Sequence, residues 1–365
     1  MLTRYSGNCR FAISIKAITM HWLTCPIPSP DQHFQHIATK RQEQLTKPSG
    51  SLGELEQLAI RLAALQATDT PCVDKVWISI FAADHGIADA GVSAFPQAVT
   101  AEMVKNFVHG GAAISVLAKQ YQAHLEIIDV GVASSLADLN IIHQKVALGT
   151  ANFLTQSAMT DKQLSLALQA GKDAVTRALA DHSQLFIAGE MGIANTSSAT
   201  AIACRLLKIK AEKLTGAGTG LDQSGIEYKA KIIQQALDKH KGIISTPLSV
   251  LQHLGGFEIA ALTGAYLAAA QQQLPVLIDG YICSVAALAA SRINADIKPW
   301  LIFTHKSQEQ GHLLILEALN TKPLLNLNMR LGEASGAAVA IPLLRSACSL
   351  HNQMATFAEA EVSES

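Results

Sequence analysis

The chain has 365 residues, 49% of them apolar and 16% charged, so it can bury a large core and is not expected to be disordered. Its 28 basic and 29 acidic residues almost cancel, which argues against nucleic acid or an anionic membrane surface as a partner. The six cysteines have no metal-binding spacing and no apolar run could span a membrane, so we expect a cytoplasmic protein with reduced thiols and no bound metal.

The N-terminal part of the chain contains one clear helical pattern. Residues 1–20 form an extension without a recognisable pattern, and prolines follow it. Within residues 21–70, leucines recur at steps of three and four from Leu52 to Leu65, which predicts an amphipathic helix. Ser51 and Glu54 have the spacing of a capping box at its start.

Residues 71–320 alternate between predicted strands and helices. The strands are expected at residues 76–82, 125–130, 185–188, 275–278 and 301–303, and the helices at 100–121, 161–180, 196–207, 225–239 and 257–272. Each strand is almost continuously apolar, which is typical of strands covered on both faces. The alternation predicts an α/β fold with a doubly wound, mostly parallel, Rossmann-like sheet. In residues 321–365 a long helix is expected from about 332 to 354, kinked or divided at Pro342.

Polar and glycine residues follow each predicted strand, as in Asp84-His85-Gly86 and Asp279-Gly280. In open α/β sheets, ligands bind at the carboxyl ends of the strands. Several such clusters at one edge therefore predict a binding site there. For His85, which has no second histidine or carboxylate cluster nearby in the sequence, a structural role is favoured.

Two glutamates are candidates for chemistry. Glu333 lies between glycines and is either a general base or simply an acidic residue favoured at a helix start. A helix start lowers a carboxyl pKa, so a base at this position needs apolar surroundings to offset that effect. Glu190 is followed by Gly192, Asn195 and Thr196, which could bind a phosphate at a helix start or could merely cap the helix.

Two further segments could meet a phosphate. Residues 216–220 are glycine-rich and precede Lys229, which suggests a phosphate-binding turn or, equally, a flexible loop. His305 and His312 are seven residues apart and flank Ser307, which suggests either a phosphate contact or a solvated loop.

The order of these segments resembles the nicotinate-nucleotide:dimethylbenzimidazole phosphoribosyltransferase family. The similar segments are residues 47–53, 83–87, 91–100, 106–107, 110–114, 189–196, 255–258, 275–280 and 330–336. The similarity extends from about residue 45 to residue 361. Gln156-Ser157 departs from the expected Glu-Pro, and residues 304–311 are a variant of the family's motif.

The resemblance implies the transfer of phosphoribose from nicotinate mononucleotide to 5,6-dimethylbenzimidazole, without a cofactor. The products are α-ribazole 5′-phosphate and nicotinate, in assembly of the cobalamin nucleotide loop. It also implies a homodimer, with a large α/β domain at residues 71–320 and a small helical domain built from residues 21–70 and 321–365. Two alternatives stay open: a different base acceptor on the same fold, and a nucleotide-binding regulator without turnover.

The resemblance further implies roles for individual residues. Glu333 would be the general base, and Glu190 would stabilise the developing ribosyl cation or assist proton transfer. The residues expected to bind substrate are Phe95, Gln97 and Leu331 around the base, Gly192, Gly218 and Lys229 around the phosphate, and Asn195, Thr196, Glu258, His305, Ser307 and Arg330 elsewhere in the site.

Overall fold

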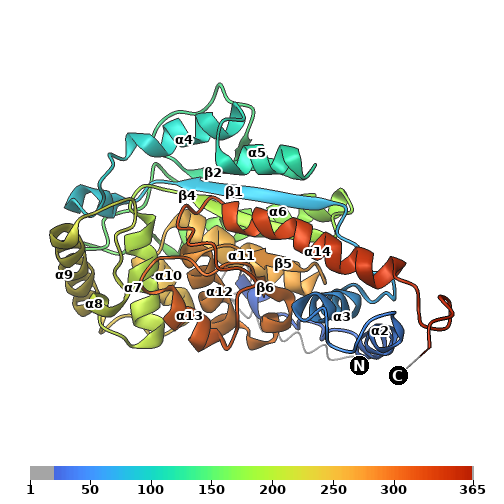
Figure 1. Ribbon diagram of the computed structural model, residues 1–365. Coiled ribbons are helices and arrows are strands. Elements are labelled where there is room, and N and C mark those ends of the chain that lie inside the picture. Colours follow the sequence, from blue (N-terminus) through green and yellow to red (C-terminus); the bar gives the residue numbers. More distant parts are fainter. Residues whose placement is uncertain (1–19, 364–365) are drawn as a thin grey trace, which may run out of the picture.

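The sheet at the centre of the molecule has six parallel strands (Figure 1). The computed structural model describes residues 20–363, so the predicted extension lies outside the described residues apart from Met20. The strands are β1 (Val76–Ala83), β2 (His124–Gly131), β3 (Ile142–His143), β4 (Leu185–Met191), β5 (Val276–Ile278) and β6 (Leu301–Phe303). Their order is β3-β2-β1-β4-β5-β6, which confirms the predicted doubly wound fold.

Helices cover both faces of this sheet. They are α2 (Gln32–Gln44), α3 (Glu54–Gln66), α4 (Ala98–Val108), α5 (Ala113–Gln120), α6 (Asp161–Ala180), α7 (Asn195–Leu207), α8 (Ala211–Leu214), α9 (Gln223–His240), α10 (Pro247–Leu254), α11 (Phe257–Gln271), α12 (Tyr281–Ile293), α13 (His312–Leu319) and α14 (Ser335–Gln353), with short 3₁₀ turns at His21–Thr24, Gly86–Ala90 and Ala295–Trp300. Figure 1 shows α4 and α5 on one side of the strands and α11 on the other. Every residue of β1 is buried between these layers, as its continuous apolar sequence predicts.

Three sequence-based details differ from the structure. The helix expected at residues 100–121 is two helices, because Gly110 has a φ of +82° and ends α4. Pro342 does not divide α14, which runs unbroken through it. The capping box at Ser51 is not formed; α3 begins after Gly53, and the Leu52 N–H donates to Glu56 instead.

Helices α6 and α11 cross unusually closely. A Cβ atom at Gly171 of α6 would collide with the backbone of α11 at Ala261, and one at Gly264 of α11 would collide with the backbone of α6 at Leu168. Nearly all of α11 is buried, so it has no polar face. The two glycines therefore let the backbones of α6 and α11 pack directly against each other.

Segments from both ends of the described chain lie against each other. Helix α3 packs on both α2 and α14, and Leu45 pairs with Thr356 in an isolated β-bridge. The Arg41 guanidinium donates to the carbonyl oxygens of His351, Asn352 and Met354. These contacts anchor the far end of α14, while the division into a large and a small domain stays a prediction.

Two other expectations concern residues throughout the fold. Within residues 20–363, no helix is both long enough and apolar enough to cross a membrane. The five cysteines of this part of the chain are free thiols, and Cys9 lies outside the described residues.

Candidate active site

A cavity of about 670 Å³ opens at the carboxyl edge of the sheet. Its walls come from the ends of β4, β5 and β6, from α4 and from the segment before α14. The predicted site residues that line it are Phe95, Glu190, Gly192, Asn195, Thr196, Gly218, His305, Ser307, Arg330, Leu331 and Glu333. The structure thus brings together residues that are more than 200 positions apart in the sequence.

The segment that carries Glu333 has an uncommon backbone. Gly332, Glu333 and Ala334 have φ angles of +86°, +61° and +61°, a left-handed run that L-residues rarely adopt. Ser335 donates to the Gly332 carbonyl oxygen from its backbone N–H at 3.0 Å and from its hydroxyl at 2.6 Å. Such strain persists only where surrounding contacts impose it, and it concentrates at functional sites.

Burial raises the pKa of Glu333 to about 7, and the negative charge of Asp279 adds to this effect. The side chain is only 7% exposed, so the loss of hydration outweighs the opposing influence of the helix start. The apolar surroundings that the sequence argument required for a base are therefore present. A carboxyl group that titrates near neutrality is suited to accept a proton at physiological pH.

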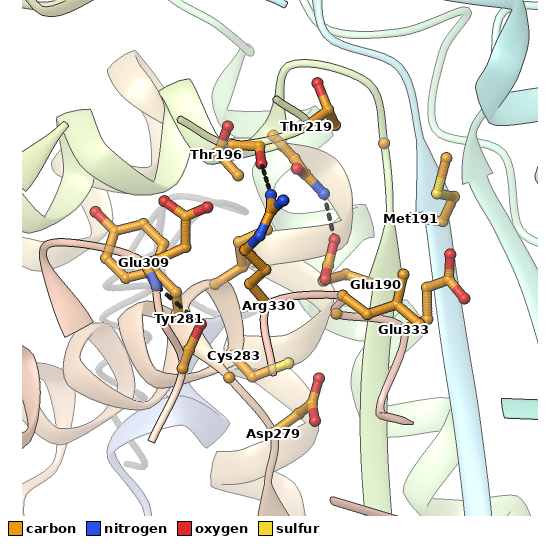
Figure 2. A pocket seen from close by; sticks show the side chains of 18 of the residues that line it. Glu190, Met191, Thr196, Thr219, Asp279, Tyr281, Cys283, Glu309, Arg330 and Glu333 are labelled. Atoms are coloured by element: carbon orange, nitrogen blue, oxygen red, sulfur yellow. Dashed lines mark hydrogen bonds between the residues drawn. The ribbon is translucent and has the colours of Figure 1, made fainter. Parts of the chain in front are cut away.

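Glu190 is a second buried carboxyl group in the same wall (Figure 2). Burial raises its pKa well above the usual value, and the charges of Glu258, Asp279 and Glu333 act in the same direction. Its partner is the Asn195 side-chain amide, which donates to it. Raised in this way, the pKa favours a neutral Glu190, which can donate a hydrogen bond to a ligand.

The start of α7 provides the features of an anion site. No side chain caps this helix, all of which is described, so the capping alternative for Asn195 and Thr196 is wrong. The Lys229 ammonium donates to the Thr196 hydroxyl at 2.8 Å, and Arg330 donates to the Gly218 carbonyl oxygen at 3.4 Å. The positive end of a helix, with a lysine and an arginine nearby, favours a phosphate.

Lys229 is almost fully buried and lies behind Thr196 rather than in the cavity wall. Burial lowers its pKa to about 8, although Glu309 counteracts this effect. The lysine therefore still carries most of its positive charge at neutral pH. It reaches the cavity through the Thr196 hydroxyl.

Two other predicted residues also lie outside the lining. The Gln97 amide donates to the His85 carbonyl oxygen at 3.4 Å. Glu258 contacts the His85 ring, with 2.6 Å between Oε1 and Nε2, and both side chains are fully buried. This pair packs behind Gly192, where a Cβ atom would collide with the Ala83 carbonyl oxygen. His85 thus has the supporting position that its sequence context favoured.

The two histidines after β6 are buried, so the solvated-loop alternative is wrong. Burial lowers the pKa of His312 to about 3, and the ring is therefore neutral. Its Nδ1 accepts from the Ser307 N–H at 2.8 Å, which leaves Nε2–H to donate to the Ser284 hydroxyl at 2.9 Å. His312 therefore fixes the loop that carries Ser307 into the cavity.

Several lining residues were not predicted as site residues. They are Val99, Met103, Met191, Ile193, Thr219, Asp279, Gly280, Tyr281, Ile282, Cys283, Glu309 and Gly332. The rule that ligands bind at strand ends could have identified Asp279, which directly follows β5. Nothing in the sequence distinguishes Met103 from any other apolar residue of an amphipathic helix.

The site combines an anion-binding end, an apolar wall and two buried carboxyl groups, Glu333 and Glu190, whose pKa values are raised by burial. On a doubly wound sheet, this combination defines an α/β enzyme that acts on a small phosphorylated molecule.

Comparisons with known proteins identify the family. A model of the phosphoribosyltransferase family matches residues 27–362. The chain is 56% identical to the nicotinate-nucleotide–dimethylbenzimidazole phosphoribosyltransferase of Ectopseudomonas mendocina, over 94% of this chain and 99% of that protein. It is 53% identical to the corresponding protein of Pseudomonas aeruginosa, over 95% and 99%. A solved structure of this phosphoribosyltransferase from Thermus thermophilus superposes with a TM-score of 0.86 at 40% identity, over 92% of this chain and 100% of that one. The chain belongs to the nicotinate-nucleotide–dimethylbenzimidazole phosphoribosyltransferase family.

Proposed function

We propose that the protein transfers phosphoribose from nicotinate mononucleotide to 5,6-dimethylbenzimidazole, giving α-ribazole 5′-phosphate and nicotinate for the cobalamin nucleotide loop. The observation that carries this proposal is the position of Glu333. Its carboxyl group, with a pKa near 7, shares one cavity with an apolar wall and an anion-binding helix start. A cavity of about 670 Å³ is of the size that binds small organic ligands.

The chemistry needs one proton acceptor. The unprotonated imidazole nitrogen of the acceptor attacks C1′ of the ribose, and the bond from C1′ to the nicotinate nitrogen breaks. The electron pair of that bond returns to the nicotinate ring, whose nitrogen loses its positive charge. The other nitrogen of the new azolium ring then releases its proton, which Glu333 accepts. Attack on the face opposite the leaving ring converts a β-nucleotide into an α-nucleotide.

The remaining residues position the two substrates. The phosphate would bind the N–H groups at the start of α7 near Gly192, with Gly218 and the charge of Lys229 behind Thr196. The aromatic acceptor would lie against Phe95 and Leu331, which are 50% and 57% exposed in the single chain. Glu190, whose pKa burial raises, would donate a hydrogen bond or relay a proton.

We also infer that the enzyme works as a homodimer in the cytoplasm. The exposed Phe95 and Leu331 side chains at the cavity rim support a second chain that completes the site. Free cysteines in the described part of the chain fit a reducing compartment. Sedimentation equilibrium checks the dimer, and a monomer at the concentrations that give full activity would contradict it.

The direct test is incubation with nicotinate mononucleotide and dimethylbenzimidazole, with products identified by mass spectrometry. We expect a product with the mass of α-ribazole 5′-phosphate and an equal amount of nicotinate. Transfer to other bases but not to dimethylbenzimidazole would indicate a different acceptor. Binding of the nucleotide without any product would indicate a regulator and would overturn the proposal.

A further inference from the structure

Asp279 links the end of β5 to the start of α14 through a hydrogen bond. It follows Ile278, the last residue of the strand, and its side chain is buried. Its Oδ1 accepts the backbone N–H of Ala337 at 2.8 Å, and the Nε2 atom of His305 lies 3.5 Å from the same oxygen. Its Oδ2 is buried without a hydrogen-bond partner among the described residues, and the residue lines the cavity together with Glu333.

This contact replaces a missing helix cap. The residue that precedes α14, Ala334, makes no side-chain capping bond, and Ala337 is the third residue of the helix. An N–H at that position has no partner within the helix, and it is usually bonded by a capping side chain of the same segment. Here Asp279 supplies the acceptor from the central sheet. It therefore fixes the helix start, to which the left-handed segment with Glu333 is directly joined.

We propose that Asp279 is a positioning residue for Glu333: its carboxylate holds the first turn of α14 and places a negative charge in the wall that both side chains share. This inference rests on the proposed function, in which Glu333 is the base. Figure 2 shows the carboxyl groups of Asp279, Glu190 and Glu333 on three separate segments around the cavity. The charge of Asp279 makes ionised Glu333 less favourable and so makes Glu333 a stronger base.

The other charged groups around the site do not replace Asp279. Burial raises the pKa of Glu190, and the charge of Glu258 raises it further, so both effects disfavour a negative charge on Glu190. His305 lies against Asp279 itself, and Arg330 bonds the Gly218 carbonyl oxygen. Asp279 is thus the carboxylate whose charge acts on Glu333 and whose oxygen also holds the adjoining helix.

The experiment compares Asp279→Asn and Asp279→Ala with the wild-type enzyme. Asparagine keeps an oxygen for the Ala337 N–H but removes the charge, whereas alanine removes both. The matched control is Asp84→Asn, because Asp84 is also a buried strand-end aspartate that accepts a backbone N–H, from Ala133 at 2.7 Å, and it does not line the cavity. For each enzyme, kcat and KM are measured across the pH range.

We expect the acidic limb of kcat/KM to move to lower pH by roughly one unit in Asp279→Asn, because Glu333 loses a repelling charge. Its kcat on the plateau should fall several-fold with little change in KM, since a weaker base accepts the proton less readily. Asp279→Ala should show the same displacement and a further loss of kcat of about tenfold or more. In Asp84→Asn the limb should stay at the wild-type pH. A wild-type limb in Asp279→Asn overturns the proposal, because a residue that only maintains the fold would not move it.

A second measurement does not depend on turnover. With carboxyl-labelled glutamate, the ¹³C signal of Glu333 is assigned by its absence in Glu333→Gln and titrated in the wild type and in Asp279→Asn. The midpoint should fall in Asp279→Asn, and an unchanged midpoint refutes the role of the charge. If the wild type forms no product, the proposed function fails while this titration still decides the effect of Asp279 on Glu333.

Discussion

Glu333 combines three properties that oppose stability in a folded protein: a left-handed backbone, burial and a neighbouring negative charge. Each of them is unfavourable for an ordinary structural glutamate. Their coincidence in a cavity wall is expected where selection acts on reactivity rather than on stability.

The substitution Glu333→Gln removes the proton acceptor but keeps the size of the side chain. We expect turnover to fall by about 10²- to 10⁴-fold, the usual contribution of a general base. Initial rates of nicotinate release measure the effect. Glu317→Gln, which changes an exposed carboxylate of α13, serves as the control and should keep the wild-type rate. A rate for Glu333→Gln within threefold of the wild type would exclude the assignment.

Lys229 supplies positive charge behind the start of α7, so its loss should weaken phosphate binding specifically. We expect Lys229→Gln to raise the KM for nicotinate mononucleotide roughly tenfold or more, with little effect on the KM for dimethylbenzimidazole. Lys231→Gln changes an exposed lysine of the same helix and is the matched control. Equal effects of the two substitutions on the nucleotide KM would show that only the general charge of α9 matters.

Among the helices, α6 and α11 can approach closely only because Gly171 and Gly264 have no Cβ atom at the contact. In an exposed helix, replacing glycine by alanine stabilises by about 1 kcal/mol. At Gly171 the added methyl group would meet the backbone of α11, which cannot move aside as a flexible side chain could. We therefore expect Gly171→Ala to lower the free energy of unfolding by about 1–3 kcal/mol, the range typical of overpacked cores.

Urea unfolding monitored by circular dichroism measures this change. The control is Gly242→Ala, because a Cβ atom at Gly242 meets no atom within 4 Å and the residue has no left-handed φ. That variant should be as stable as the wild type or slightly more stable. If Gly171→Ala were also stabilised, the packing of α6 on α11 would be looser than the structure shows.

The strength of the local sequence signal determines which helices and strands could be predicted. The five predicted strands and α6, α7, α9 and α11 were located to within a few residues, because apolar runs and helical periodicity are local signals. Strand β3 has two residues and too short a pattern to recognise. The break between α4 and α5 was missed because the apolar pattern resumes directly after Gly110 and Gly111, so the two helices were predicted as one.

For the site, the sequence could indicate the edge of the sheet but not the pairing of side chains across it. Glycines and polar residues after a strand identified Glu190 and Gly192. The glycines on both sides of Glu333 made it a candidate, and the family resemblance gave it the role of general base. The bond from Asp279 to Ala337 joins residues 58 positions apart, and only the folded arrangement of β5 and α14 creates it. The raised pKa of Glu333 could not be predicted either, because burial depends on the whole cavity wall.

At the scale of the whole molecule, Glu333 makes stability depend on pH. Its pKa rises from 4.5 in a free chain to about 7 in the fold, so between these values the native state binds more protons than the unfolded state. The contribution of this residue to the free energy of unfolding therefore decreases as pH rises from about 4.5 to 7. Above pH 7 the full penalty of the buried charge, on the order of 3 kcal/mol, is present.

Glu333→Gln should remove this dependence. We expect the variant to be more stable than the wild type above pH 7, by up to about 3 kcal/mol, and to differ little from it near pH 4.5. Urea unfolding of both proteins at several pH values measures the difference. A constant difference across this range would mean that Glu333 titrates normally in the fold.

The left-handed segment at Gly332, Glu333 and Ala334 has a consequence for engineering. Glycine and asparagine adopt such a backbone with less strain than glutamate, and neither is buried as a charge. A random library at position 333 that is selected only for heat resistance should therefore be enriched in these two residues. Every such survivor would lack the proton acceptor, so thermal selection at this position would recover robust but inert proteins unless each round also scored product.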